Sequence, residues 1–194
     1  MPIPLGVLAV AGAGGGAATN AFELLETQTL SGTQASITFS NLNTNYGSTY
    51  QHLQLRLVTR TSRTDADSDP ILIRFNSDSG NNYARHGLRA GFGSLSSVGS
   101  TAQSAIFLTE NSAVNKNASN IFTPIVADLL NPFEDRQKTV RAISGLLASG
   151  WYGTELWSGN WANTSAITTI TLLPLIGANF VAGCRFSLYG TRIT

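Results

Sequence analysis

Residues 51–60 read QHLQLRLVTR, with leucine at positions 53, 55 and 57 and mostly polar residues between them. An apolar residue at every second position is the pattern of a β-strand with one buried face. PILIRFN (70–76) and TTITLLP (168–174) repeat this pattern. Period-two alternation therefore recurs along the chain and predicts a protein built from strands.

Seven further segments are predicted as strands, because they are rich in β-branched or aromatic residues and lie between clusters of Asn, Ser, Gly and Pro. They are residues 23–30, 36–41, 82–89, 104–109, 121–129, 138–147 and 185–190. Residues 61–69 and 91–103 are expected to be loops, and NPFEDRQ (131–137) is consistent with either a helical turn or a polar hairpin loop. Regularly spaced short strands without long helices predict an all-β fold, a jelly-roll β-sandwich of about 8–10 strands.

The composition indicates one domain with a weakly charged surface. A chain of 194 residues suits a single domain, and charged residues make up only 12% of it, about half the usual share. Twelve basic and eleven acidic side chains leave a net charge of +1, which argues against nucleic acid as the main ligand. Weak charge repulsion also favours association with a partner or with further copies of the chain.

The first twenty residues, MPIPLGVLAVAGAGGGAATN, contain no charge. They do not fit a signal peptide, which begins with a basic region, because the first Lys or Arg is Arg56. The apolar run is also too short to span a bilayer, which needs about 20 apolar residues, so no membrane partner is expected. We interpret residues 1–20 as an extended docking arm and residues 21–194 as the sandwich. The arm has a glycine tether and apolar anchors that bind a partner, namely Ile3, Leu5, Val7, Leu8 and Val10.

Catalytic motifs are scarce. The Gly-x-Ser-x-Gly nucleophile elbow is absent. A carboxylate pair is available in principle from Glu110, Glu134, Asp135 and Glu155, but such residues occur on the loops of any β protein. The single Cys184 excludes a disulfide framework and a Cys-based zinc site, and it is expected to be a small core residue. We therefore expect a protein that is not an enzyme and has no cofactor.

The segment DADSD places Asp65, Asp67 and Asp69 at the spacing with which a calcium loop begins. The rest of that loop is missing, because Pro70 stands where a glycine is required and Asn76 where a bidentate glutamate is required. A solvated hairpin tip is favoured over a weak calcium site, so no metal is predicted.

The segment GWYGTELWSGNW (150–161) concentrates aromatic residues and has two interpretations. An exposed aromatic platform beside Asn and Ser holds sugars through apolar contact and hydrogen bonds. Alternatively, alternate members are core anchors of one strand and its turn. The residues concerned are Trp151, Tyr152, Trp157 and Trp161.

Several stretches together resemble a family of virion proteins of tailed bacteriophages, including cyanophages. They are MPIPLGVLAVAGAG (1–14), ITFSNL (37–42), YQHLQLRLVTRT (50–61), IRFNSDSGNNYARH (73–86), KTVRAISG (138–145), WANTSAITTITLLP (161–174) and NFVAGCRFSLYG (179–190). The similarity covers nearly the whole chain. The joint pattern of RFN-x-D-x-G-x-N-Y and a terminal RFSLYG is its most specific part.

This resemblance implies a jelly-roll β-sandwich that serves as a structural part of the virion, without catalytic residues to carry over. Two functions are open. The first is a capsid decoration (cement) protein that binds the major capsid protein and stabilises the shell, as a homo-oligomer that family analogy makes a trimer. The second is a tail or fibre component that binds a host-surface glycan through its aromatic loops.

Overall fold

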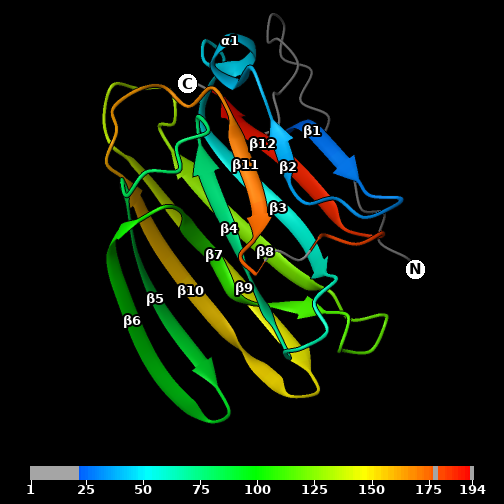
Figure 1. The fold of residues 1–194 in the computed structure, drawn as a ribbon. Helices are drawn as coiled ribbons and strands as arrows, with labels where there is room; N and C mark the ends of the chain where they lie inside the picture. The colour runs from blue at the N-terminus through cyan, green and yellow to red at the C-terminus, as the bar shows by residue number, and fades with distance from the viewer. Residues whose placement is uncertain (1–21, 177–178, 193–194) are drawn as a thin grey trace, which may run out of the picture.

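The computed structural model describes residues 22–176 and 179–192, and this part of the protein is built almost entirely from β-strands (Figure 1). The elements of the described part are β1 (Glu23–Thr29), β2 (Ile37–Phe39), α1 (Leu42–Tyr46), β3 (Tyr50–Thr61), β4 (Asp69–Phe75), β5 (Tyr83–Gly91), β6 (Ser94–Gln103), β7 (Ile106–Val114), β8 (Thr123–Leu130), β9 (Lys138–Ala148), β10 (Trp151–Trp161), β11 (Ile170–Pro174) and β12 (Arg185–Arg192). The predicted all-β class is confirmed.

The strands form two antiparallel sheets that lie as layers in Figure 1. The larger sheet has the order β1-β12-β3-β8-β9-β10-β5-β6, and the smaller has the order β2-β11-β4-β7. The two sheets are joined where Arg60 and Thr61 at the end of β3 pair in parallel with Ala113 and Val114 at the end of β7. The arrangement is a β-sandwich with twelve strands in the described residues, more than the sequence pattern predicted.

The core lies between the layers and is formed by the alternation read from the sequence. Leu53, Leu55 and Leu57 of β3 are all buried, as their period-two spacing predicts. In β4, Ile73 and Phe75 are also buried. Each such side chain contributes roughly 1.5–3 kcal/mol when it leaves water.

Aromatic pairs connect the two layers at β10. The ring of Trp161 lies 5.5 Å from that of Phe75 in the smaller sheet, and the ring of Trp157 lies 5.1 Å from that of Phe107. Gly87 on β5 makes room for Trp157, because a Cβ atom there would lie 2.8 Å from carbons of the indole ring. These contacts therefore pack strand β10 of the large sheet, which lies beyond β8, against the small sheet.

Two hairpins, β5–β6 and β9–β10, extend the large sheet by four strands. They come from different places in the chain, and they join because β10 pairs with β5 from Trp161 opposite Tyr83 to Gly153 opposite Gly91. We call the four strands β9-β10-β5-β6 the extension. Both hairpin tips lie at the lower end of the molecule in Figure 1.

The structure corrects the prediction of a loop at residues 91–103, since most of this stretch is strand β6. Its Ser- and Gly-rich sequence has low intrinsic strand preference. Pairing with β5 along its length imposes the strand instead. Residues 61–69, also expected to be a loop, are irregular only between the end of β3 and the start of β4.

Of the two interpretations of residues 131–137, the structure favours the polar turn, which links β8 to β9. The side chain of Lys138 stabilises this turn, because its buried Nζ donates hydrogen bonds to the backbone carbonyls of Glu134 (2.6 Å) and Thr164 (3.0 Å). The helical turn lies elsewhere, at α1. Within residues 22–176 and 179–192, no helix has the length and apolar character needed to cross a membrane.

Candidate functional site

The structure separates the four aromatic residues that the sequence suggested as a glycan platform. Trp157 and Trp161 point inward and are 1% exposed. Their indole N–H groups donate to Glu155 (2.9 Å) and Asp78 (2.8 Å) inside the protein. These two residues are therefore core anchors, and the platform interpretation is restricted to the other two, half-buried Trp151 and exposed Tyr152.

The three aspartates of DADSD do not converge on a shared site. Asp65 forms an ion pair with Arg63, and Asp67 forms one with Lys116. Asp69 is buried, and its burial raises the pKa of its carboxyl. In the described part of the chain, no group of three or more His, Cys, Asp or Glu side chains is arranged to hold a metal ion. The weak calcium hypothesis therefore gains no support from the geometry.

Two further sequence predictions have different outcomes. Cys184 is confirmed as a core residue, and burial raises the pKa of its thiol. Its Sγ accepts a hydrogen bond from the Arg60 backbone N–H at 3.2 Å. The anchors of the docking arm lie outside the described residues, so the arm stays a prediction; they are Ile3, Leu5, Val7, Leu8 and Val10.

An apolar surface on the outer face of the extension was missed by the sequence analysis. Alternation along each strand points every second side chain away from the core. In the extension these positions hold Leu88, Leu156 and Ile143, which form a row across β5, β10 and β9 because Leu156 lies opposite both others. A shallow depression of about 310 Å³, lined by Pro124, Val126 and Thr154, lies beside Ile143.

This row continues toward the two hairpin tips. Seven of the twelve large hydrophobic side chains that are exposed in the described chain lie here, namely Leu88, Phe92, Leu95, Ile143, Leu147, Tyr152 and Leu156. We call these seven residues the outer apolar surface. Contiguous exposed apolar patches on otherwise polar proteins mark sites of interaction.

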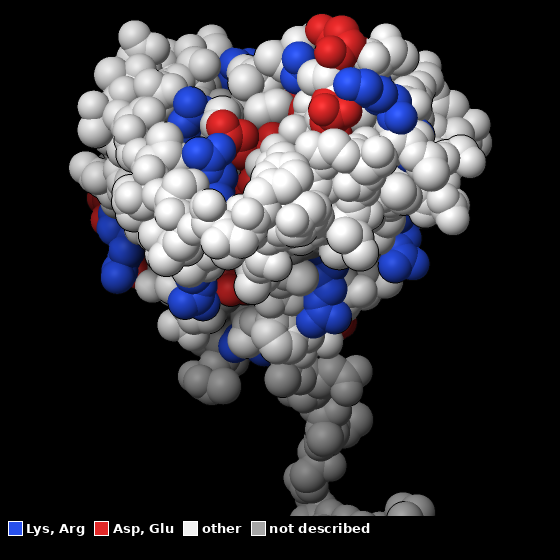
Figure 2. Space-filling model, turned by 90° about the horizontal axis from the view of Figure 1, so that it is seen from below, with Lys and Arg blue, Asp and Glu red and all other residues white. Residues whose placement is uncertain are grey.

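The outer apolar surface is also free of charge around the tips. Residues 90–109 and 142–154 contain no Asp, Glu, Lys or Arg. Figure 2 views the molecule from the end at which the tips lie and shows an uncharged band with charged groups on both sides. A partner that binds this surface meets few charged groups, so its affinity is expected to depend only weakly on salt concentration.

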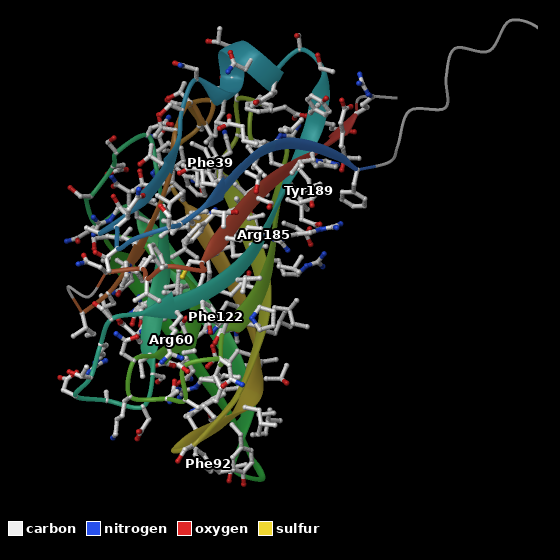
Figure 3. All side chains as sticks on the ribbon, turned by 90° about the vertical axis from the view of Figure 1, so that its right-hand side faces the viewer. Phe39, Arg60, Phe92, Phe122, Arg185 and Tyr189 are labelled. Carbon is white, nitrogen blue, oxygen red and sulfur yellow. The ribbon has the colours of Figure 1, made fainter. Side chains whose placement is uncertain are left out.

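An aromatic cluster occupies the tips themselves. Phe92 lies at the lower end of the molecule in Figure 3, with its ring 4.6 Å from that of Tyr152 and 6.4 Å from that of Trp151. Phe92 and Gly93 form the two-residue turn between β5 and β6, with φ of 52° and 75°. Such turns favour Asn, Asp or Gly, and a bulky residue at positive φ is strained. Strain of this kind concentrates at functional positions.

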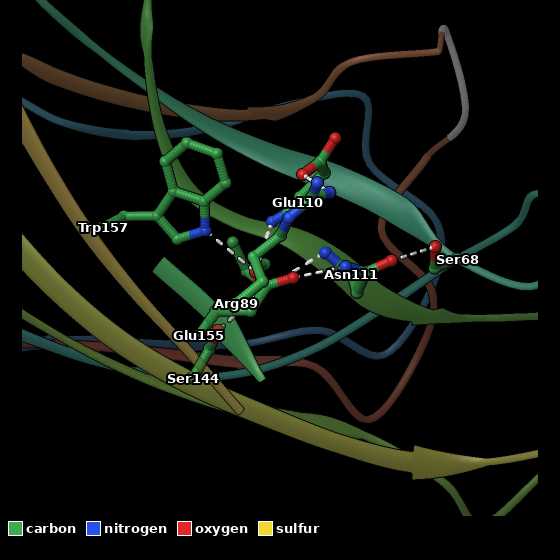
Figure 4. Close-up of polar contacts among 8 residues, drawn as sticks. Ser68, Arg89, Glu110, Asn111, Ser144, Glu155 and Trp157 are labelled. Atoms are coloured by element: carbon green, nitrogen blue, oxygen red, sulfur yellow. Dashed lines mark hydrogen bonds and ion pairs between the residues drawn. The ribbon is translucent and has the colours of Figure 1, made fainter. Parts of the chain in front are cut away.

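A buried polar network fixes the extension to the smaller sheet (Figure 4). Glu155 of β10 is 1% exposed. Its carboxylate accepts hydrogen bonds from the Thr109 hydroxyl (2.9 Å), the Glu110 backbone N–H (2.7 Å), the Trp157 indole and the Asn111 amide. One buried carboxylate therefore ties β10 to three consecutive residues of β7.

Neighbouring contacts complete this network. The Ser144 hydroxyl of β9 donates to the Thr109 hydroxyl at 2.9 Å. Arg89 of β5 forms an ion pair with Glu110. Strands β5, β9 and β10 are thus all bound to β7, so the outer apolar surface rests on a fixed support. Glu110 and Glu155, two of the acids available for a carboxylate pair, here serve structural contacts.

Comparisons with known proteins found no matching family model, no similar curated protein and no similar solved structure.

We predict that Glu155→Ala lowers the free energy of unfolding by about 2–4 kcal/mol, because it leaves several buried donors without an acceptor. Glu155→Gln, which keeps the shape and one carbonyl oxygen, will cost less. Urea denaturation of the two variants and the wild type measures both effects. Equal stability of Glu155→Ala and the wild type would show that the network does not hold the extension.

We also predict that Phe92→Asn leaves the protein more stable than Phe92→Ala. Both changes remove the ring, but Asn tolerates positive φ and Ala does not, a difference of about 1 kcal/mol. Thermal unfolding of the pair isolates this backbone preference. If the two variants unfold together, the strain assigned to Phe92 is absent.

Proposed function

We propose that this protein is a structural component of a tailed-phage virion, specifically a capsid decoration (cement) protein that binds the major capsid protein through its outer apolar surface. The observation that carries the proposal is this surface, an uncharged apolar patch on a firmly held extension of the sheet. The sequence resemblance supports the virion location, and it favours a structural over a catalytic role.

A jelly-roll fold is part of the proposal, and the strand order supports it. With the β5–β6 and β9–β10 hairpins treated as insertions, eight strands form the halves β1-β12-β3-β8 and β2-β11-β4-β7. The first strand then pairs with the last and the second with the next to last. We interpret this nested order as two Greek keys wound into a jelly roll, an architecture common in viral capsids.

The chemistry of the outer apolar surface suits a permanent contact with a protein shell. Each fully buried leucine or isoleucine contributes roughly 1.5–3 kcal/mol. The serines and threonines around the patch supply neutral hydrogen bonds, which are typical of an interface rim. The predicted arm, with Ile3, Leu5, Val7, Leu8 and Val10 as anchors, would add a second attachment to the same shell.

A tail or fibre component that binds a host-surface glycan is the alternative function. The contact of Phe92 with Tyr152 and Trp151 at the hairpin tips favours it, because exposed aromatic rings stack on sugar faces. This function predicts few copies per particle and a loss of adsorption when Trp151 or Tyr152 is replaced. Trp157 and Trp161 do not test it, since their replacement disturbs the core.

The decoration function is tested by Ile143→Lys in the middle of the outer apolar surface. We expect normal folding, because the side chain is 52% exposed, and binding to particles that lack the protein at least about tenfold weaker, the cost of burying a charge in an apolar contact. Co-sedimentation of purified protein with such particles measures the binding.

Leu24→Lys is the matched control, because Leu24 on β1 is also 52% exposed and lies outside the outer apolar surface. It should bind like the wild type. Undiminished binding of Ile143→Lys, or equal losses in the two variants, would contradict the assignment of this surface.

A further inference from the structure

The edge strands of the two sheets differ in how well they are protected against pairing with another strand. An edge strand presents unpaired backbone N–H and C=O groups, and proteins usually block it with charges, with a short strand or with covering groups. The sheet order leaves four edges among the described strands: β1 and β6 in the large sheet, β2 and β7 in the small one. The edge at β2 is three residues long, and β1 carries Glu23 and Glu26.

The edge at β7 is covered by side-chain oxygens. The Glu110 backbone N–H donates to Glu155 at 2.7 Å, and the Val114 backbone N–H donates to Asn117 Oδ1 at 2.8 Å. Between them, the Ala113 backbone N–H donates to the Thr123 hydroxyl at 2.9 Å. Three of the four edges are therefore protected against pairing with another strand: β1 by its charges, β2 by its short length and β7 by side-chain oxygens.

From Ser94 to Ser100, where its pairing with β5 is regular, the edge at β6 has none of these protections. Its ten residues, SLSSVGSTAQ, contain no charge and no proline, and they span about 34 Å at the usual rise of an antiparallel strand. Most of them are exposed. Figure 1 shows β6 at the margin of the sheet, and among the described strands only β5 pairs with it.

The hairpin turn between β5 and β6 determines which backbone groups of β6 point away from β5. Gly91 and Ser94 close a two-residue hairpin, and the pairing stays regular from Ser94 to Ser100. In such a hairpin the two closing residues form backbone hydrogen bonds with each other. Beyond them, every second residue of one strand forms backbone hydrogen bonds with the residue opposite it on the other strand. The N–H and C=O groups of Leu95, Ser97 and Gly99 therefore point to the open edge.

We propose that β6 pairs antiparallel with β6 of a second copy of this chain, about a twofold axis at Ser97. A twofold axis sets each strand against its own sequence, and an uncharged strand meets no like charge there. With this register, Leu95 of one copy lies opposite Gly99 of the other. Leu95 is 75% exposed, and it covers the space that Gly99 leaves free.

This pairing has a consequence for the outer apolar surface. A twofold axis perpendicular to the sheet keeps the outer faces of both copies on the same side. Leu88 lies opposite Ser97 on the neighbouring strand, so the two surfaces meet at the axis and become one. The dimer goes beyond the proposed function and does not depend on it, because it forms from purified protein alone. It is proposed in place of the trimer that the resemblance implies.

Ser97→Lys tests the pairing, because the twofold axis places the two new charges opposite each other. Sedimentation equilibrium should give a dimer for the wild type and a dissociation constant raised at least about tenfold for Ser97→Lys. Thr38→Lys is the matched control, since Thr38 is an exposed residue on the β2 edge, and it should remain a dimer. A monomeric wild type, a trimer, or a Ser97→Lys variant with unchanged dimerisation would overturn the proposal.

Cross-linking provides a second test with a smaller change. Cys184 is buried, so an introduced thiol is the accessible one in the described part of the chain. Under a mild oxidant, Ser97→Cys should form a disulfide-linked dimer, because paired residues at the axis lie about 5.5 Å apart at Cα. Thr38→Cys should stay monomeric on a non-reducing gel. Equal cross-linking of the two variants would refute the β6 interface even if the protein is dimeric.

Discussion

The pairing of β10 with β5 is the contact on which the candidate site depends. It joins two hairpins inserted at different points of the sandwich into one four-stranded extension. The two faces of the extension have different roles. On the inner face Trp157 and Trp161 pack against the smaller sheet, whereas on the outer face Leu156 and Leu88 lie side by side and exposed. Strand alternation alone produces both, because it points successive side chains of one strand to opposite faces of the sheet.

The distribution of polar groups follows the same division. The buried carboxylate of Glu155 gathers its donors on the inner side of the extension and binds it to β7. The hairpins that carry the tips hold no charge over residues 90–109 and 142–154. A firm support beneath an apolar, uncharged surface is suited to lasting attachment, because little conformational freedom is lost when the partner binds. The open edge of β6 lies beside this surface, and the proposed dimer would extend the surface onto a second copy.

The sequence was sufficient for the strands whose alternation is strong, such as β3, and for the buried position of Cys184. It failed at β6, because SLSSVGSTAQ has little apolar alternation and becomes a strand through its partner β5. Spacing alone could have separated Trp157 and Trp161 from Tyr152, since odd and even positions of a strand face opposite sides. The outer apolar surface was not predictable, because Ile143 and Leu156 resemble core residues until the layers are known. The Glu155 network joins residues more than forty positions apart, which no local pattern reveals.

The proposal that this protein coats a capsid predicts many copies in each particle. The measurement that tests it most directly is the number of copies per particle, by quantitative mass spectrometry of purified virions against the major capsid protein. A ratio near one copy per capsid subunit is the result that a decoration protein predicts. Only a handful of copies per particle would contradict the account and would place the protein in the tail, with Trp151 and Tyr152 as its contact with the host.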